Sequence, residues 1–347
     1  MTNPHFSFYY LFVWSKNEVI RNLIRVFTKS KISSVKISFV NDFYLNHLAV
    51  FFFEKMNIIQ EERISIDPVS MLSTESVTVH TLRLDVIHPE ISGNKWYKLR
   101  FYLDEAIQSK KKGILTFGGA YSNHIAATGA ACKAAGIESI GIIRGEEPIQ
   151  FGHTLTTARE QGMKLVFLSR TAFKNKLMPD DLSTEDYQIV PEGGYGILGA
   201  NGASTIPYPK NDFDIICCAT GTGTMLAGLI KNKSRLASVQ GFSVLKNNFS
   251  IVEEVKTLLE NQTEPIPMHH QFHFGGYAKH HPSLFQFMND LYQQTKIPTD
   301  FVYTGKLFFG VNKLIQENYF EKGSRILIIH SGGLQGNLSL KKGTLIF

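Results

Sequence analysis

Cysteine is scarce in this chain of 347 residues: there are three, and they form no CxxC or CxxH pair. Such pairs mark most zinc sites and disulfide frameworks, so neither is expected. Cys217 and Cys218 are adjacent in an apolar run, so in a β-strand their side chains would point to opposite faces. We expect reduced thiols and a cytoplasmic protein.

Long hydrophobic runs and long runs of one charge are also lacking. The apolar residues 8–14 are too few to span a bilayer, and they lack the basic start and small-residue cleavage site of a signal peptide. The net charge is +6, but the basic residues are scattered. Their one short run, residues 110–112, falls where a helix should end, a place the helix dipole favours for cations. We therefore expect no membrane and no nucleic-acid partner.

Glycine is absent from the first 53 residues, a stretch rich in Phe, Ile, Asn and Lys. This composition differs from the remainder, and no functional motif lies there. We treat residues 1–60 as an extra N-terminal segment. Two alternatives stay open: a disordered extension, or a mis-assigned start with Met56 as the true one.

From residue 64 onward, apolar strands alternate with amphipathic helices. Alternation of this kind predicts an α/β protein with a mainly parallel sheet covered on both faces. The segments that carry the pattern are residues 77–84, 97–109, 113–117, 123–135, 139–143, 154–161, 164–168, 213–219, 224–231, 239–244, 251–259, 283–293, 307–318 and 325–329.

Residues 219–224, Ala-Thr-Gly-Thr-Gly-Thr, follow an expected strand and open an expected helix. Glycines let the backbone approach an anion, backbone N–H groups and the helix dipole hold it, and threonine hydroxyls add donors. This pattern indicates a phosphate site. Two alternatives are a plain strand–helix turn and a dinucleotide fingerprint through Gly221, Gly223 and Ala227, which lacks the acidic residue expected about 20 positions on.

Two lysines stand three positions apart in residues 92–99, Ser-Gly-Asn-Lys-Trp-Tyr-Lys-Leu. Lysines at this spacing are often solvated surface residues. Here the preceding Gly-Asn marks a tight turn, and a lysine held in an apolar turn has a lowered amine pKa and can form an imine. Lys95 is therefore a candidate nucleophile.

Two further loops carry polar groups at glycine turns. In residues 118–124, Gly-Gly-Ala-Tyr-Ser-Asn-His, the side chains of Ser122 and Asn123 and the N-terminal N–H groups of the next helix could bind a carboxylate, although Ser122 could also be a plain N-cap. Tyr277 directly follows two glycines, and Tyr303 lies two residues before Gly305. Tyrosines near glycine turns are common, so their position alone indicates no function. The histidines of residues 269–281 have no interleaved carboxylate or cysteine at ligand spacing, so no metal site is expected.

Taken in order, these segments, with Pro-Glu-Gly-Gly at residues 191–194 and Tyr-Thr-Gly-Lys at residues 303–306, resemble the D-cysteine desulfhydrase and 1-aminocyclopropane-1-carboxylate (ACC) deaminase family. These are pyridoxal-phosphate (PLP) enzymes of the tryptophan-synthase-β fold type, and the resemblance covers about residues 64–338. It implies fold type II: two domains, each an open, mainly parallel twisted sheet flanked by helices, with PLP in the cleft between them. We expect a large PLP domain at residues 61–97 plus 209–347, a small domain at residues 98–208, and a homodimer.

The resemblance also implies residue roles. Lys95 matches the lysine that holds PLP as a Schiff base, and Lys98 a lysine that contacts the phosphate. Tyr303 matches a catalytic tyrosine and Tyr277 a second one, although its Gly-Gly-Tyr-Ala-Lys context departs from the usual Gly-Tyr-Gly. The phosphate would be bound by Thr220, Gly221, Thr222, Gly223 and Thr224, and the substrate carboxylate by Ser122, Asn123 and His124; Asn123 also bonds the phenolic oxygen of PLP, and Ser122 counts among the catalytic residues.

The choice of substrate turns on Thr304, where the resemblance places the partner of the pyridine nitrogen; Ser331 is the alternative partner. ACC deaminases carry glutamate at the first position, and a threonine hydroxyl supplies no such charge. Without that charge the pyridine nitrogen is not kept protonated, so the cofactor is a weaker electron sink. A weaker sink is sufficient for the loss of a good leaving group, but it is less suited to ring opening. We therefore favour breakdown of D-cysteine or a related β-substituted amino acid over deamination of ACC. Alternatives from other classes are a nicotinamide-dependent oxidoreductase and a non-catalytic binding protein.

Overall fold

A computed structural model describes residues 58–179, 182–260 and 264–347 of the chain. The N-terminal segment expected at residues 1–60 lies, up to residue 57, outside the described residues, and so does Met56. In the described part, no helix is long and apolar enough to cross a membrane, and no three His, Cys, Asp or Glu side chains gather as they would around a metal ion.

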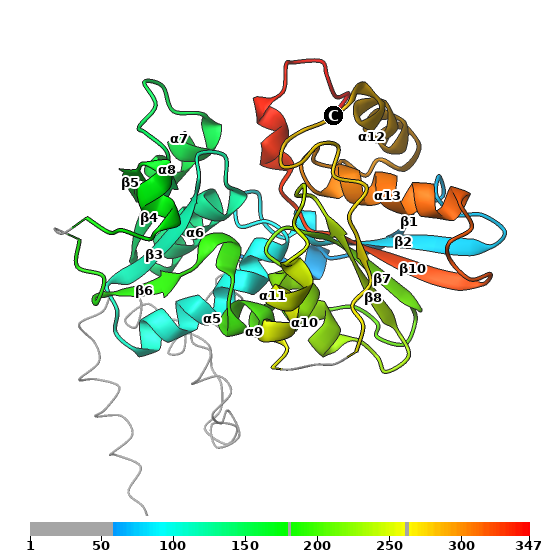
Figure 1. Ribbon diagram of the computed structural model, residues 1–347, viewed down its shortest axis with the longest axis horizontal. Coiled ribbons are helices and arrows are strands. Elements are labelled where there is room, and N and C mark those ends of the chain that lie inside the picture. Colours follow the sequence, from blue (N-terminus) through cyan, green and yellow to red (C-terminus); the bar gives the residue numbers. More distant parts are fainter. Residues whose placement is uncertain (1–57, 180–181, 261–263) are drawn as a thin grey trace, which may run out of the picture.

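The strands form two separate sheets, which occupy opposite sides of the molecule in Figure 1. In the larger sheet β1 is antiparallel to β2 and every other pair is parallel, and in the smaller sheet every pair is parallel. The larger has the order β1 (Ile66–Pro68), β2 (Val77–Arg83), β10 (Ser324–His330), β7 (Ile215–Thr220), β8 (Ser238–Ser243) and β9 (Met268–His269); the smaller has β5 (Lys164–Leu168), β4 (Glu138–Arg144), β3 (Gly113–Gly119) and β6 (Tyr187–Val190).

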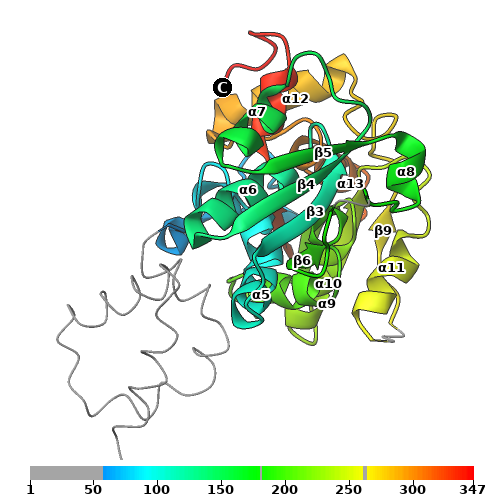
Figure 2. The ribbon, with the colours of Figure 1, turned by 90° about the vertical axis from the view of Figure 1, so that its left-hand side faces the viewer.

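Helices cover both faces of each sheet (Figures 1 and 2). On the larger sheet, α12 (Pro282–Thr295) and α13 (Thr304–Gln316) lie on one side, and α10 (Thr224–Asn232) and α11 (Ile251–Leu258) on the other. On the smaller sheet, α6 (Asn123–Ala135) and α7 (His153–Glu160) lie opposite α8 (Arg170–Lys174). The predicted α/β class with two flanked, mainly parallel sheets is confirmed.

The alternation of side chains along β7 agrees with the expectation for its two cysteines. Cys217 packs in the apolar cluster on the α13 side, with Leu307 and Val311, while Cys218 packs in the cluster on the α10 side, with Leu226. Both cysteines are fully buried. A strand buried on both faces reads as a continuous apolar run, which is why the sequence shows no two-residue alternation there.

Helix α5 (Asn94–Gln108) joins the two sheets. Its buried residues share one apolar cluster with residues of β3 and β6 of the smaller sheet and of β7 and β10 of the larger one. With α9 (Ile197–Ala203), α5 forms the packed base between the two sheets in Figure 1. The first turn of α5 carries Lys95 and Lys98, so both lysines are placed where the two sheets meet.

The element boundaries differ from the expectation mainly at short segments. The helix expected from residue 97 starts at Asn94, because Gly93 ahead of it adopts a left-handed φ of 59° that turns the chain into the helix. The elements β1, β6, β9, α8 and α9 were not predicted, since two to seven residues are too few to show a period. The smaller sheet uses residues 113–190 and the larger one the two flanking regions. The domain limits 61–97, 98–208 and 209–347 stay a prediction.

Candidate functional site

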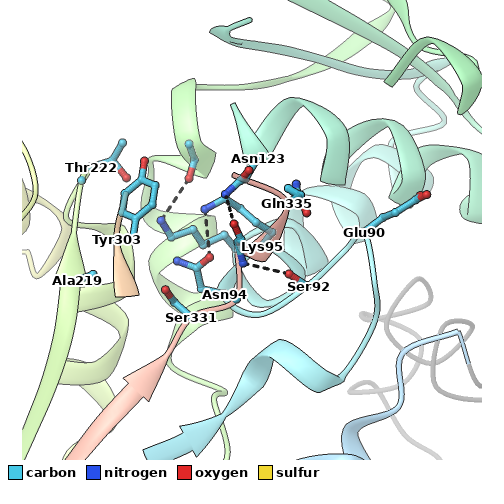
Figure 3. Close-up of a pocket in the computed structure, with 15 residues that line it drawn as sticks. Glu90, Ser92, Asn94, Lys95, Asn123, Ala219, Thr222, Tyr303, Ser331 and Gln335 are labelled. Carbon is cyan, nitrogen blue, oxygen red and sulfur yellow. Dashed lines mark hydrogen bonds between the residues drawn. The ribbon is translucent and has the colours of Figure 1, made fainter. Parts of the chain in front are cut away.

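A cavity opens where the carboxyl ends of β7 and β10 meet the first turn of α5 (Figure 3). This is the position at which parallel α/β sheets bind ligands. The lining comes from six segments that are far apart in sequence. It consists of Glu90, Ser92, Asn94, Lys95, Lys98, Asn123, Gly193, Ala219, Gly221, Thr222, Tyr303, Ser331, Gly332, Gly333 and Gln335.

The turn before Lys95 is fixed against the loop after β10. A Cβ atom on Gly93 would lie 1.9 Å from the carbonyl oxygen of Ser331, so a side chain there would collide with backbone. The same carbonyl accepts the N–H of Asn94 at 3.1 Å, and the N–H of Gly93 binds the carbonyl of Leu84 at 2.9 Å. The glycine of the Gly-Asn pair is therefore needed both for its φ and for close approach.

The amines of Lys95 and Lys98 are both shielded from solvent in the same cavity. Burial lowers the pKa of Lys95 to about 8, against an opposing attraction from Asp300. Burial and the charge of Lys95 lower the pKa of Lys98 well below its ordinary value. Their Nζ atoms donate to Oδ1 of Asn94 at 3.1 Å and to the carbonyl of Gly193 at 3.3 Å. An anion bound here would relieve the repulsion between them.

The loop 219–224 leads from β7 into α10, as the sequence predicted. Gly221 and Thr222 line the cavity, and the hydroxyls of Thr222 and Thr224 hydrogen-bond to each other at 3.0 Å. Gly223 has a φ of 75°, and a Cβ there would lie 2.6 Å from Val255 on α11, so packing as well as conformation requires glycine. Thr220 lies outside the lining set and donates its hydroxyl to the carbonyl of Cys218 at 3.4 Å.

Of the three residues in the predicted carboxylate loop, Ser122, Asn123 and His124, only one lines the cavity. Asn123 lines the cavity and donates Nδ2 to the carbonyl of Gly333 at 3.4 Å (Figure 3), while its Oδ1 is buried and finds no hydrogen-bond partner among the described residues. Ser122 takes the N-cap position of α6 without a capping side-chain bond in the described structure. Neither Ser122 nor His124 is in the lining set.

His124 is 1% exposed and its tautomer follows from its neighbours. Thr116 donates its single hydroxyl hydrogen to the carbonyl of Val190 at 2.8 Å, so Nε2 of His124 must be the donor in its 2.8 Å bond to the Thr116 oxygen. Nδ1 then carries a lone pair, and within the described chain it has no partner. Burial, helped by Lys95 and Lys98, lowers the pKa of His124 well below its ordinary value, so the ring is neutral.

The two predicted tyrosines lie together. The rings of Tyr277 and Tyr303 meet edge-on with their centroids 6.1 Å apart. Tyr303 is in the cavity wall, while Tyr277 is 41% exposed and outside the lining set. Burial, followed by the proximity of Tyr277, raises the pKa of Tyr303 well above its usual value, so this hydroxyl keeps its proton.

Of the two candidate partners for a pyridine nitrogen, Ser331 lines the cavity and Thr304 is absent from the lining set. Thr304 is fully buried at the start of α13 and hydrogen-bonds to Asp300. The carboxylate of Asp300 also accepts the N–H groups of Val302, Tyr303 and Thr304 at 2.8 to 2.9 Å, so it caps this helix.

Several residues of the site escaped the sequence analysis. Asp300 gave no capping signal, because the helix was expected only from residue 307, whereas α13 begins at Thr304. Glu90 and Gln335 carry no local signal; Glu90 accepts a hydrogen bond of 2.6 Å from Gln161 at the end of α7. Lys306 had been noted only as part of the Tyr-Thr-Gly-Lys match, and it is 1% exposed.

The donor set fits PLP. A buried primary amine can attach the aldehyde carbon, the glycine-rich turn at the N-terminus of α10 can hold the phosphate, and Ser331 offers a neutral hydroxyl. Oδ1 of Asn123 is a buried polar atom that still lacks a hydrogen-bond partner in the described structure. Gly221 lines the cavity without a side chain, and a Cβ atom added there would lie 3.4 Å from the Tyr303 ring.

Fold and site together define a fold type II protein in which Lys95 and the glycine-rich turn before α10 line one cavity. Comparison with known proteins agrees. Over 280 residues the chain is 28% identical to a provisionally named ACC deaminase of Pyrococcus horikoshii, covering 74% of this chain and 85% of the relative. It is also 28% identical over 288 residues to the mitochondrial bifunctional D-cysteine desulfhydrase/ACC deaminase of Arabidopsis thaliana, covering 73% and 72%.

Solved structures give the same answer. One described as an ACC deaminase homologue matches with a TM-score of 0.65 at 28% identity, over 79% of this chain and 90% of that one. More distant solved structures, at 12% to 15% identity, are similar in fold alone. No protein-family model matches the chain. The predicted resemblance to D-cysteine desulfhydrases and ACC deaminases is thus confirmed by sequence and by structure.

Proposed function

We propose that this protein is a cytoplasmic, homodimeric PLP-dependent lyase that converts D-cysteine and water to pyruvate, ammonia and hydrogen sulfide. The observation that carries the proposal is the buried amine of Lys95, with its pKa lowered to about 8, in one cavity with the glycine-rich turn at the start of α10. A desolvated amine and an anion cradle are the two features a PLP enzyme needs first. The small-domain loop 122–124 supplies the place for the substrate carboxylate.

When bound, PLP supplies the electron sink. The protein groups then have separate tasks in this proposal. Lys95 attaches the cofactor, and after its release its Nζ takes the α-proton of the substrate. Lys98 and the turn 220–224 hold the phosphate. Asn123 and the N-terminal N–H groups of α6 bind the carboxylate, and Tyr303, which keeps its proton, can donate a hydrogen bond to the departing thiolate.

The reaction with ACC, which gives 2-oxobutyrate and ammonia, is the second candidate, since the names of the relatives favour it. The surroundings of the ring nitrogen favour D-cysteine instead. Ser331 is a neutral hydroxyl in the cavity wall, and the carboxylate of Asp300 is taken up by three backbone N–H groups and Thr304. A ring nitrogen without a carboxylate partner remains a weaker electron sink, which is enough to expel a thiolate.

Two measurements test this proposal. Borohydride reduction of the PLP-loaded protein, followed by peptide mass spectrometry, should place the cofactor on Lys95, and Lys95→Ala should show neither the absorbance nor the label. Lys98→Ala is the matched control: it should keep the label but bind PLP more weakly. Turnover of D-cysteine and ACC is then scored by pyruvate, sulfide and 2-oxobutyrate. A label on another lysine would contradict the role of Lys95, and faster release of 2-oxobutyrate from ACC would reverse the substrate order.

A further inference from the structure

The loop that carries Tyr277 has an unusual backbone. Phe274, Gly275, Gly276 and Ala278 have φ values of 53°, 93°, 125° and 54°. Two of these four residues are not glycine, and a left-handed φ costs such residues free energy. Conformations of this kind persist when the surrounding structure holds them. Contacts with neighbouring elements must therefore hold this loop in its conformation.

The main anchor is a buried lysine on α13. Lys306 is 1% exposed, and its Nζ donates to the carbonyl oxygens of His273 at 2.9 Å and Gly276 at 2.8 Å. His273 directly precedes the left-handed residues and Gly276 is one of them, so the two bonds span Phe274 and Gly275. The same helix adds an apolar contact, since the rings of Phe274 and Phe309 pack edge-on at 4.9 Å.

Holding an ammonium group in this position has a cost. Burial lowers the pKa of Lys306 to about 8, and the attraction of Asp300 recovers part of the loss. Apolar residues could fill the same space without that cost, but they could not bind the two carbonyls. The two hydrogen bonds to the loop carbonyls are therefore what a lysine provides at this position and an apolar residue does not.

Lys306 stands three residues after Tyr303, at the start of the same helix. One short segment thus carries one tyrosine and ties down the loop that carries the other. The edge-on contact of the two rings depends on where that loop lies. A displaced loop would take the Tyr277 ring away from the Tyr303 ring.

We infer that Lys306 is a positioning residue, which acts through the carbonyls of His273 and Gly276 to hold Tyr277 against Tyr303, a residue of the cavity wall. Its effect on turnover rests on the function proposed above, whereas its effect on the loop does not. The two parts are separately measurable.

The order of the loop is measured by limited digestion with trypsin at the exposed Lys279, and by hydrogen exchange of the amides of residues 273–279. Lys306→Met keeps the length of the side chain and removes the donors, and it should speed cleavage about tenfold, as expected for a local opening made easier. Lys306→Arg keeps donors and should restore much of the protection. Lys313→Met, on the same helix, is the matched control and should leave the rate unchanged.

Turnover is measured in a double-mutant cycle with Tyr277→Phe on the PLP-loaded enzyme. Lys306→Met should lower kcat about tenfold in the parent and have almost no further effect in the Tyr277→Phe background, because residues that act through one contact are not additive. The absorbance of bound PLP should stay unchanged throughout. If the Met variant does not fold, Lys306→Gln takes its place in both measurements.

Unchanged cleavage and exchange in Lys306→Met would overturn the anchoring. Fully additive losses of kcat, or a loss of kcat that Lys306→Arg does not reduce, would overturn the action through Tyr277. Absence of turnover in the parent with every amino acid tested would instead refute the proposed function, and in that case faster cleavage of Lys306→Met would still support the anchoring.

Discussion

Thr304 donates its hydroxyl hydrogen to Oδ1 of Asp300 at 2.7 Å, and its oxygen accepts the backbone N–H of Asp300 at 2.8 Å. Both residues are fully buried. A threonine hydroxyl has one hydrogen, and here it is already used. This relationship favours Ser331 over Thr304 as the group that meets a ring nitrogen in the cavity.

The first prediction compares the two hydroxyls. Thr304→Val should lower the free energy of unfolding by about 1–3 kcal/mol, because the Asp300 N–H and carboxylate lose a buried partner. It should leave the absorbance of bound PLP unchanged. Ser331→Ala should shift that absorbance with little effect on unfolding by denaturant. A shifted spectrum in Thr304→Val with no change in Ser331→Ala would reverse the assignment.

The second prediction concerns the pH dependence of cofactor loading. The pKa of Lys95 is lowered to about 8, and only the neutral amine attacks an aldehyde. Below pH 8 the rate of PLP uptake by protein freed of cofactor should therefore rise about tenfold per pH unit, and it should level off above pH 8. Stopped-flow absorbance between pH 6 and 9.5, at constant ionic strength, gives the profile; a midpoint near 10.5 would mean that the amine is solvated.

The third prediction concerns Asp85, whose carboxylate binds Arg83 at 2.7 and 2.8 Å and lies 3.2 Å from Nδ1 of His330. Burial tends to raise the pKa of Asp85, but His330 and Arg83 outweigh it and hold this pKa below its ordinary value. Asp85→Asn should lower the free energy of unfolding by about 3–5 kcal/mol at pH 7, since it removes the buried carboxylate that holds two nitrogens of Arg83.

The sign of the pH effect follows from the lowered pKa. The stabilisation by Asp85 is fully present above the pKa of an unfolded aspartate, and it is lost as the pH falls through the lower folded value. The difference between parent and Asp85→Asn should thus shrink in acid. Asp67→Asn is the matched control: its side chain binds the same Arg83 at 3.1 Å but is 35% exposed, so about 0–1 kcal/mol is expected. Equal losses in the two variants would refute the argument from burial.

The fourth prediction separates collision from conformational strain at glycine. Gly93→Ala would place a Cβ 1.9 Å from the Ser331 carbonyl, which should displace the Lys95 turn and abolish PLP attachment. Gly162→Ala is the control, because Gly162 has a φ of 86° but no described atom within 4 Å of the new Cβ. It should cost about 1–2 kcal/mol and leave the cofactor bound. Attachment of PLP in Gly93→Ala at the parental rate would contradict this view of the turn.

The sequence was informative wherever the signal is local. Loops that follow apolar strands point to the cavity, so Asn123, Gly221 and Thr222 were found from pattern alone. His124 shows the limit of this reasoning: it belongs to the same loop as Asn123, but its ring bonds to Thr116 on β3 and does not line the cavity. The direction in which a side chain points from the first turn of a helix depends on tertiary packing. The spacing of residues in the sequence does not show it.

Contacts between distant parts of the chain were out of reach for another reason. Nothing near Lys306 in the sequence indicates that its amine binds carbonyls about thirty residues earlier, at His273 and Gly276. The bond from Asn123 to Gly333 likewise joins two segments that meet only because two sheets pack together. Apolar periodicity predicts the sheets, but it does not specify which loops will face each other.

The order of strands in the larger sheet also bears on when the protein becomes competent during synthesis. β10 follows the other described strands of this sheet in the chain, yet it lies inside the sheet, between β2 and β7. A nascent chain that has released everything up to α13 would therefore present two unpaired strand edges and an unfinished Lys95 turn, since the Ser331 carbonyl follows β10. Until that segment leaves the ribosome, those edges are open to pairing with other chains.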